Sequence, residues 1–128
     1  MRFPTPPLRK PRSNAGAAAE ELAAEFLQSR GLSLVKRNYR CRGGEIDLIA
    51  SDGETLIFVE VRLRSDAAFG GAAESITAAK KKRLSFAAAH YLSRLKPARR
   101  EPPCRFDAIL MATLDPARIE WLVDIDAN

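Results

Sequence analysis

The chain has 128 residues, of which 46% are hydrophobic and 29% are charged. A chain of this length and composition can fold as one domain without disulfide bonds, and it does not belong to the class of disordered proteins. The formal net charge of +5 suits a polyanionic partner such as nucleic acid, although charge alone does not identify one.

The cysteines and the N-terminal segment argue against two further classes of protein. Cys41 and Cys104 lie far apart in the sequence, and neither is near His90, the only histidine, so we expect no zinc site. Residues 1–13 are rich in proline and arginine and lack the apolar stretch of a signal peptide. No run reaches the ~18 apolar residues of a membrane span. We therefore expect a cytoplasmic, reduced protein with a flexible basic arm over 1–13 and a single domain over 14–128.

The periodicity of the apolar residues predicts an order of elements that we write αβββαββ. The elements, in chain order, are a helix over 14–30, a strand over 32–39, strands over 45–51 and 55–63, a helix over 76–95, and strands over 105–112 and 118–125. Residues 65–75 show no clear period and indicate a loop. This order predicts an α/β fold with one mixed sheet flanked by helices.

The central hairpin decides which side chains share a face of the sheet. Asp52-Gly53 is a strong signal for a two-residue turn. With that turn Glu45 lies across from Glu60, while Asp47 faces Phe58 and is a diagonal neighbour of Glu60, at a backbone separation of roughly 7–8 Å. Alternation places an apolar set on the opposite face: Ile46, Leu48, Ile57, Val59, Val61 and Leu63.

Three acidic side chains would be crowded on this half-buried face, and their repulsion requires a compensating positive charge. Carboxylate oxygens favour Mg²⁺ or Mn²⁺, which typically bind one or two carboxylates together with water and phosphate oxygens. Such an ion can acidify a water molecule and neutralise charge on a scissile phosphate. Arg62 could instead neutralise the acids in a structural ion network, and the pattern alone does not separate these two interpretations.

Two stretches carry a family resemblance: Gly43-Gly44-Glu45-Ile46-Asp47-Leu48-Ile49-Ala50 and Phe58-Val59-Glu60-Val61-Arg62-Leu63-Arg64. They resemble the signature of the uncharacterised bacterial YraN-type family, which is itself similar to the PD-(D/E)XK nucleases, notably archaeal Holliday-junction resolvases. Further matches, spread over roughly residues 14 to 126, are Gly16, Glu20, Gly70-Gly71, Lys80 and Arg105-Phe106-Asp107. The resemblance implies a restriction-endonuclease-like fold, with an αβββαβ core and one extra C-terminal strand.

The resemblance also implies a function, namely a metal-dependent endonuclease that acts on DNA, including branched or repair intermediates, with Mg²⁺ or Mn²⁺ as cofactor. Asp47 and Glu60 would bind the metal, and Glu20 would support them from the first helix. Arg62 stands where such nucleases have lysine; arginine stabilises negative charge but, with a pKa above ~12, transfers protons poorly. Lys80 on the second helix could supply the missing amine. Further residues expected to bind nucleic acid are Arg42, Arg64, Lys80 and Lys81.

Two other functional interpretations remain open at this stage. One is a non-catalytic nucleic-acid-binding module of the same fold, which the arginine at position 62 favours. The other is an interaction domain in which Arg62 simply neutralises the carboxylates. By analogy with resolvases, the protein could form a homodimer through Phe69, Trp121 and the last strand.

Four further side chains are predicted to have structural roles. His90 has no acidic partner at a suggestive spacing, so we expect it to be a surface or half-buried structural residue. Tyr91 and Trp121 are expected in the core or at its rim. Asp107 is expected to pair with Arg105 or a neighbouring basic group.

Overall fold

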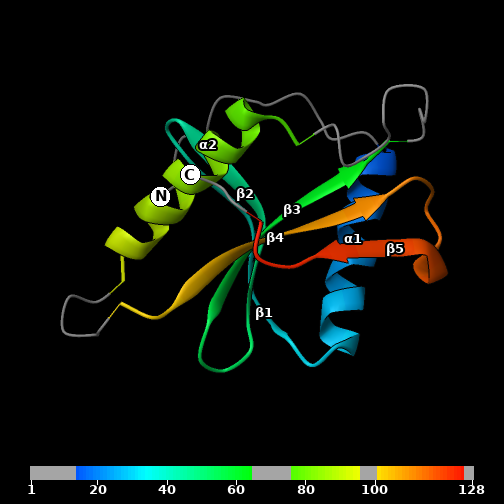
Figure 1. Ribbon diagram of the computed structural model, residues 1–128, viewed down its shortest axis with the longest axis horizontal. Helices are drawn as coiled ribbons and strands as arrows, with labels where there is room; N and C mark the ends of the chain where they lie inside the picture. Colours follow the sequence, from blue (N-terminus) through cyan, green and yellow to red (C-terminus); the bar gives the residue numbers. More distant parts are fainter. Residues whose placement is uncertain (1–13, 65–75, 96–100, 126–128) are drawn as a thin grey trace, which may run out of the picture.

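The computed structural model describes residues 14–64, 76–95 and 101–125 (Figure 1). Its elements are α1 (Asn14–Ser29), β1 (Ser33–Cys41), β2 (Gly44–Ser51), β3 (Leu56–Leu63), α2 (Ala78–Ser93), β4 (Cys104–Met111), the 3₁₀ helix η3 (Pro116–Arg118) and β5 (Ile119–Leu122). The arm predicted over 1–13 and the loop predicted over 65–75 lie outside the described residues.

The strands form one mixed sheet in the spatial order β1-β2-β3-β4-β5. Neighbouring strands are antiparallel except β3 and β4, which run parallel and are joined by the connection that contains α2. A crossover connection of this kind is what a parallel pair requires. The predicted αβββαβ core with one extra C-terminal strand is therefore confirmed.

The two helices cover opposite faces of the sheet, each over its own apolar cluster (Figure 1). The α1 cluster consists of buried alanine and leucine side chains of the helix and of aliphatic side chains from the strands: Ala19, Ala23, Ala24, Leu27, Leu48, Ala50, Ile57, Val59, Val61, Ile109 and Met111. The α2 cluster is richer in aromatic residues: Tyr39, Ile46, Ile49, Phe58, Leu84, Ala87 and Ala88, with Tyr91 and Phe106 packed against it. Burial of these apolar stripes explains why both segments are helical.

The predicted ends of several elements need correction: β1 extends to Cys41 and not to 39, and α2 ends at Ser93 and not at 95. The second helix begins at Ala78 and not at 76, because the Thr77 side chain caps it by accepting a hydrogen bond from the Lys80 N–H (3.2 Å). The last strand ends at Leu122 and not at 125. Asp124 has a positive φ of 60°, which interrupts the extended conformation.

The two-residue turn predicted at Asp52-Gly53 is wrong. Residues 52–55 form a four-residue loop, and Ser51 pairs with Leu56. One oxygen of the Asp52 carboxylate accepts hydrogen bonds from the backbone N–H groups of Glu54 (2.9 Å) and Thr55 (2.7 Å). This side-chain capping, typical of Asp in turns, stabilises the wider loop.

The wider loop shifts the hairpin register by two residues. Phe58 pairs with Ile49, not with Asp47, and the ladder ends at the pair of Leu48 and Val59, one residue before Asp47 and Glu60. The prediction that Glu45 faces Glu60 is therefore wrong. Because side chains alternate with a period of two, a shift of two residues does not by itself move any side chain to the other face.

One side chain of the hairpin nevertheless lies on the other face from the one predicted. Ile46 packs in the α2 cluster beside Tyr39, whereas Leu48 belongs to the α1 cluster. Between them the β1–β2 ladder lacks a pair at Asn38 and Asp47, and Asn38 has a left-handed φ of 53°. The strand alternation is inverted at this irregularity.

Candidate functional site

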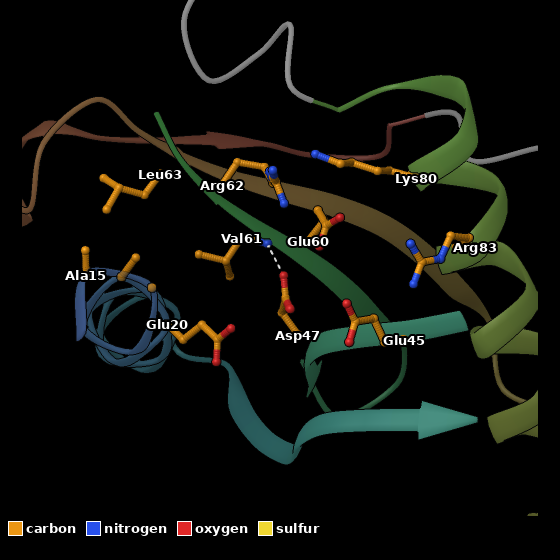
Figure 2. Close-up of a pocket in the computed structure, with 12 residues that line it drawn as sticks. Ala15, Glu20, Glu45, Asp47, Glu60, Val61, Arg62, Leu63, Lys80 and Arg83 are labelled. Carbon is orange, nitrogen blue, oxygen red and sulfur yellow. Dashed lines mark hydrogen bonds between the residues drawn. The ribbon is translucent and has the colours of Figure 1, made fainter. Parts of the chain in front are cut away.

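A pocket of about 350 Å³ opens where β2 and β3 separate (Figure 2). The last β2–β3 pair is Leu48 with Val59; beyond it, β2 pairs only with β1 and β3 only with β4. This split in the sheet lets side chains from both helices reach one site. The lining residues are Ala15, Gly16, Ala19 and Glu20 of α1, Glu45 and Asp47 of β2, Glu60, Val61, Arg62 and Leu63 of β3, and Lys80 and Arg83 of α2.

Asp47 spans the gap between the separated strands. One of its carboxylate oxygens accepts a hydrogen bond from the backbone N–H of Val61 (2.8 Å), shown as a dashed line in Figure 2. This bond takes the place of a backbone ladder bond and satisfies a buried donor. Asp47 is only 8% exposed. Its carboxylate is therefore held in one position beside Glu60.

Glu60 lies beside Asp47 in the pocket and forms a hydrogen bond with it. Burial, followed by this hydrogen bond and the negative charge of Asp47, raises the pKa of Glu60 from 4.5 to about 9. The positive charge of Arg62 acts in the opposite direction but does not cancel the effect. Near neutral pH the acid pair therefore retains a proton, for which a bound cation would compete.

Two basic side chains extend toward the same acid pair. Arg62 follows Glu60 by two residues on β3, and Lys80 reaches the pocket from the first turn of α2 (Figure 2). Burial, and then the positive charge of Arg62, lower the pKa of Lys80, while the negative charge of Glu60 raises it. The site thus combines an acid pair with two basic side chains, Arg62 and Lys80, that line the same pocket.

Glu20 and Glu45 lie at the periphery of the acid pair. Glu20 lines the pocket from α1, to the lower left of Asp47 in Figure 2. Glu45 also contacts Arg40, with 3.6 Å between the arginine Nε and a carboxylate oxygen. Within the described ranges, no three Asp, Glu, His or Cys side chains are grouped so that they could hold a metal ion. Glu20 therefore does not complete a three-ligand set with Asp47 and Glu60 in this arrangement.

The pair of Asp47 and Glu60 nevertheless fits a hard divalent cation. Mg²⁺ keeps several of its waters and typically takes one or two protein carboxylates, completing its shell with substrate phosphate oxygens. The buried Asp47 carboxylate and the half-buried Glu60 carboxyl, whose pKa is raised by burial and by Asp47, match this requirement. The donor set does not fit zinc, which prefers nitrogen and sulfur ligands in a closed tetrahedron.

The other residues predicted to bind nucleic acid lie around the pocket but do not line it. Arg42 is exposed in the turn between β1 and β2, and Lys81 is partly exposed on α2. Arg64 follows β3, where its backbone N–H donates to the Met111 carbonyl (3.0 Å). Their contacts with phosphate remain predictions.

Arg83 and Gly44, the glycine that positions it, were not predicted as site residues. A Cβ atom at Gly44 would lie 2.2 Å from the Arg83 carbonyl oxygen, so α2 packs directly on the backbone of β2. Arg83 lines the acid pocket and also a second hollow beside it. The glycine pair before Glu45 was the available signal, because glycine in a strand often marks close backbone approach.

The structural roles predicted for other polar side chains are confirmed. Asp107 is fully buried; its carboxylate accepts hydrogen bonds from Arg105 Nε (3.0 Å), Trp121 Nε1 (2.9 Å) and the Asp124 N–H (2.9 Å). His90 is partly buried, and its Nδ1 lies 2.5 Å from the Tyr39 hydroxyl. Neither network lines the acid pocket.

The helices of the described segments, α1 and α2, are too short and too polar to cross a membrane. The homodimer stays a prediction. Phe69 lies outside the described residues, and Trp121 packs edge-to-face against Phe26, with 5.9 Å between the ring centroids.

The fold and the pocket define an α/β protein with an acid pair at the split of a mixed sheet. The model of the uncharacterised protein family UPF0102 matches residues 19–111, and the chain belongs to this family. A UPF0102 protein of Cupriavidus pinatubonensis is 57% identical over 109 residues, covering 84% of this chain and 80% of the relative. A UPF0102 protein of Methylobacillus flagellatus is 53% identical over 109 residues, covering 85% and 93%. The resemblance to the YraN-type family is thereby confirmed.

Proposed function

We propose that this protein is a metal-dependent nuclease that cleaves phosphodiester bonds of DNA in the pocket between β2 and β3. The observation that carries the proposal is the acid pair. Asp47 and Glu60 lie together at the split of the sheet, where burial and Asp47 raise the pKa of Glu60, and they line one pocket with Arg62 and Lys80. A divalent cation bound to a substrate phosphate is a natural counter-charge for such a pair.

Asp47 and Glu60 would hold Mg²⁺ or Mn²⁺, which would polarise the phosphate and lower the pKa of a bound water. The hydrogen bond from Val61 to Asp47 orients one acid before substrate arrives. Arg62 is placed to stabilise negative charge on the phosphate through its fixed guanidinium donors. Lys80, whose pKa is lowered by burial, is the better proton carrier of the two.

Glu20 has a more distant part in this proposal. It lines the pocket from α1 but is not grouped with Asp47 and Glu60 as a third ligand. A carboxylate in such a position can orient metal-bound water by a hydrogen bond and so support the ligands without replacing one of them. Arg42, Arg64 and Lys81 would bind the DNA backbone outside the pocket.

A second candidate function is a nucleic-acid-binding module without catalysis. The observation that favours it is Arg62, since a guanidinium beside Glu60 neutralises the acid pair without being able to transfer protons. In that case the basic side chains bind phosphate and the acids serve only the fold.

Cleavage of labelled four-way, flapped, single-stranded and duplex DNA, with Mg²⁺ or Mn²⁺, tests the proposal. The variant to compare is Asp47→Asn, because asparagine keeps an oxygen that can accept the Val61 N–H and removes only the charge. Glu25→Gln is a matched control: it removes one carboxylate from an exposed position of α1 outside the pocket. Circular dichroism verifies that both variants are folded.

We expect Asp47→Asn to lose about 100-fold or more of the activity, the scale on which removal of one electrostatic partner acts in an active site, and Glu25→Gln to retain it. Equal cleavage by Asp47→Asn and the native protein would remove Asp47 from the site. Absence of cleavage by the native protein on every substrate, with binding that weakens as salt rises, would favour the non-catalytic module.

A further inference from the structure

Phe86 is an exposed aromatic side chain on α2 beside the turn between β1 and β2. The residue is 55% exposed. The ring lies against Gly43 in the turn between β1 and β2, where a Cβ atom would come within 3.1 Å of the ring atom Cε1. Gly43 also has a positive φ of 95°, so glycine suits both the turn and the close contact. The β1–β2 turn thus supports the ring, and more than half of the residue's surface faces solvent.

The position of Phe86 on the helix links it to the acid pocket. Lys80, Arg83 and Phe86 are three residues apart and form one diagonal row that extends about 9 Å along the helix axis. Lys80 and Arg83 line the acid pocket. Arg83 also lines the second hollow, of about 360 Å³, together with Arg40 and Gly43. A strand with one phosphate in the acid pocket could therefore follow this row to the ring.

The charges around Phe86 favour a polyanion. Lys82 and Arg83 lie one helical turn before it and are exposed, and Arg42 is exposed next to Gly43. Glu45 also lines the second hollow, but Arg40 Nε lies 3.6 Å from its carboxylate and offsets its charge. Cations that bind the backbone, combined with an aromatic face that accepts any base, are the usual means of binding single strands.

We propose that Phe86 is a stacking platform for an unpaired base of the nucleic acid strand whose phosphate occupies the acid pocket. This inference rests on the proposed function and specifies its substrate class, namely DNA with a single-stranded segment next to the cleaved bond. A paired base inside a duplex has no free face to offer, so fully paired DNA cannot use the platform.

The competing explanation is structural, because the Phe86 ring also covers the glycine turn. Phe86→Leu separates the two roles, since leucine keeps an apolar cover over Gly43 but has no aromatic face. Phe86→Trp offers a larger face. Val35→Ala is the control, because Val35 is 45% exposed and lies on β1 six residues before the end of that strand, about 20 Å from the turn.

The test measures binding of a fluorescently labelled single-stranded oligonucleotide and of its duplex, without added divalent metal so that no cleavage occurs. A second single strand carries 2-aminopurine, whose fluorescence falls when it stacks on an aromatic ring. Thermal unfolding verifies that each variant is folded.

We expect Phe86→Leu to weaken single-strand binding by about 5- to 100-fold, as for loss of one stacked base, and to abolish the 2-aminopurine quenching. Duplex binding should change by less than about 2-fold, and the dependence on salt should be unaltered because no charge is removed. Phe86→Trp should retain both binding and quenching, and Val35→Ala should match the native protein.

Single-strand binding by Phe86→Leu equal to that of the native protein would overturn the stacking role. Equal weakening of single-strand and duplex binding would also overturn it, because a general disturbance of the turn has that effect. Either result leaves the proposed nuclease function standing. Failure of the native protein to bind the single strand would overturn this inference, while the proposed function is judged separately by cleavage with Mg²⁺ or Mn²⁺.

Discussion

Replacement of Glu60 by glutamine should stabilise the protein at neutral and alkaline pH. Burial, and then the hydrogen bond and the charge of Asp47, raise the pKa of Glu60 from 4.5 to about 9 in the folded state. Between pH 4.5 and about 9, Glu60 is protonated in the folded state and ionised in the unfolded state. The stability of the native protein therefore falls as pH rises through this range. Glutamine cannot ionise and can still donate a hydrogen bond to Asp47, so the variant is exempt from this loss.

The size of the effect follows from the same two values. Neutral pH lies about 2.5 pH units above the ordinary pKa of glutamate, which sets a ceiling of about 3 kcal/mol on the gain at pH 7. We expect a gain on the order of 1–3 kcal/mol there, a larger gain at pH 8.5 and almost none at pH 4.5. Urea unfolding at these three pH values measures it, with exposed Glu25→Gln as control. A difference between Glu60→Gln and native protein that is independent of pH would refute the reasoning.

Three further outcomes are expected. Mg²⁺ or Mn²⁺ should raise the melting temperature of the native protein at pH 8 more than that of Glu60→Gln, because a ligand of the folded state stabilises it; equal shifts in a metal titration would contradict a site at the acid pair. Gly44→Ala should cost about 1–3 kcal/mol in urea unfolding, because the added Cβ would meet the Arg83 carbonyl; an unchanged midpoint would refute the close packing. Asp107→Ala should cost about 3–5 kcal/mol and shift the fluorescence of Trp121, whose indole N–H loses its acceptor; unchanged fluorescence would contradict this.

Most of the fold could be predicted from the sequence because periodicity determines it. The helices and strands bury apolar stripes whose spacing is visible in the chain, and all seven of these elements are present. The hairpin register could not be predicted, because the loop at 52–55 is stabilised by the side chain of Asp52 and not by the backbone preference of a two-residue turn. The paired side chains of the hairpin still lie on their predicted faces of the sheet, because the register shifted by an even number of residues.

The position of Ile46 could not be predicted for a different reason. A strict alternation from Leu48 places it on the α1 face, and nothing in the motif signals that the ladder is irregular opposite Asn38. Glu20, Asp47 and Lys80, which the sequence predicted to share a site, all line one pocket, and their functional roles stay predictions. Arg83 was not predicted because it ends the basic run Lys80-Lys81-Lys82-Arg83, and such a run on a helix usually forms a solvent-exposed face.

The split between β2 and β3 explains how residues from both faces of the sheet reach one pocket. In a continuous sheet, Glu20 of α1 and Lys80 of α2 would be separated by the strands, and both line one pocket here because the β2–β3 ladder ends at Leu48 and Val59. The Asp47 carboxylate closes the resulting gap in backbone hydrogen bonding at Val61.

An acceptor at position 47 is therefore required by the fold as well as by the proposed chemistry. For this reason the loss of folding in an alanine variant would say nothing about catalysis. Substitution by asparagine, which retains the acceptor and removes the charge, is the change that separates the two roles.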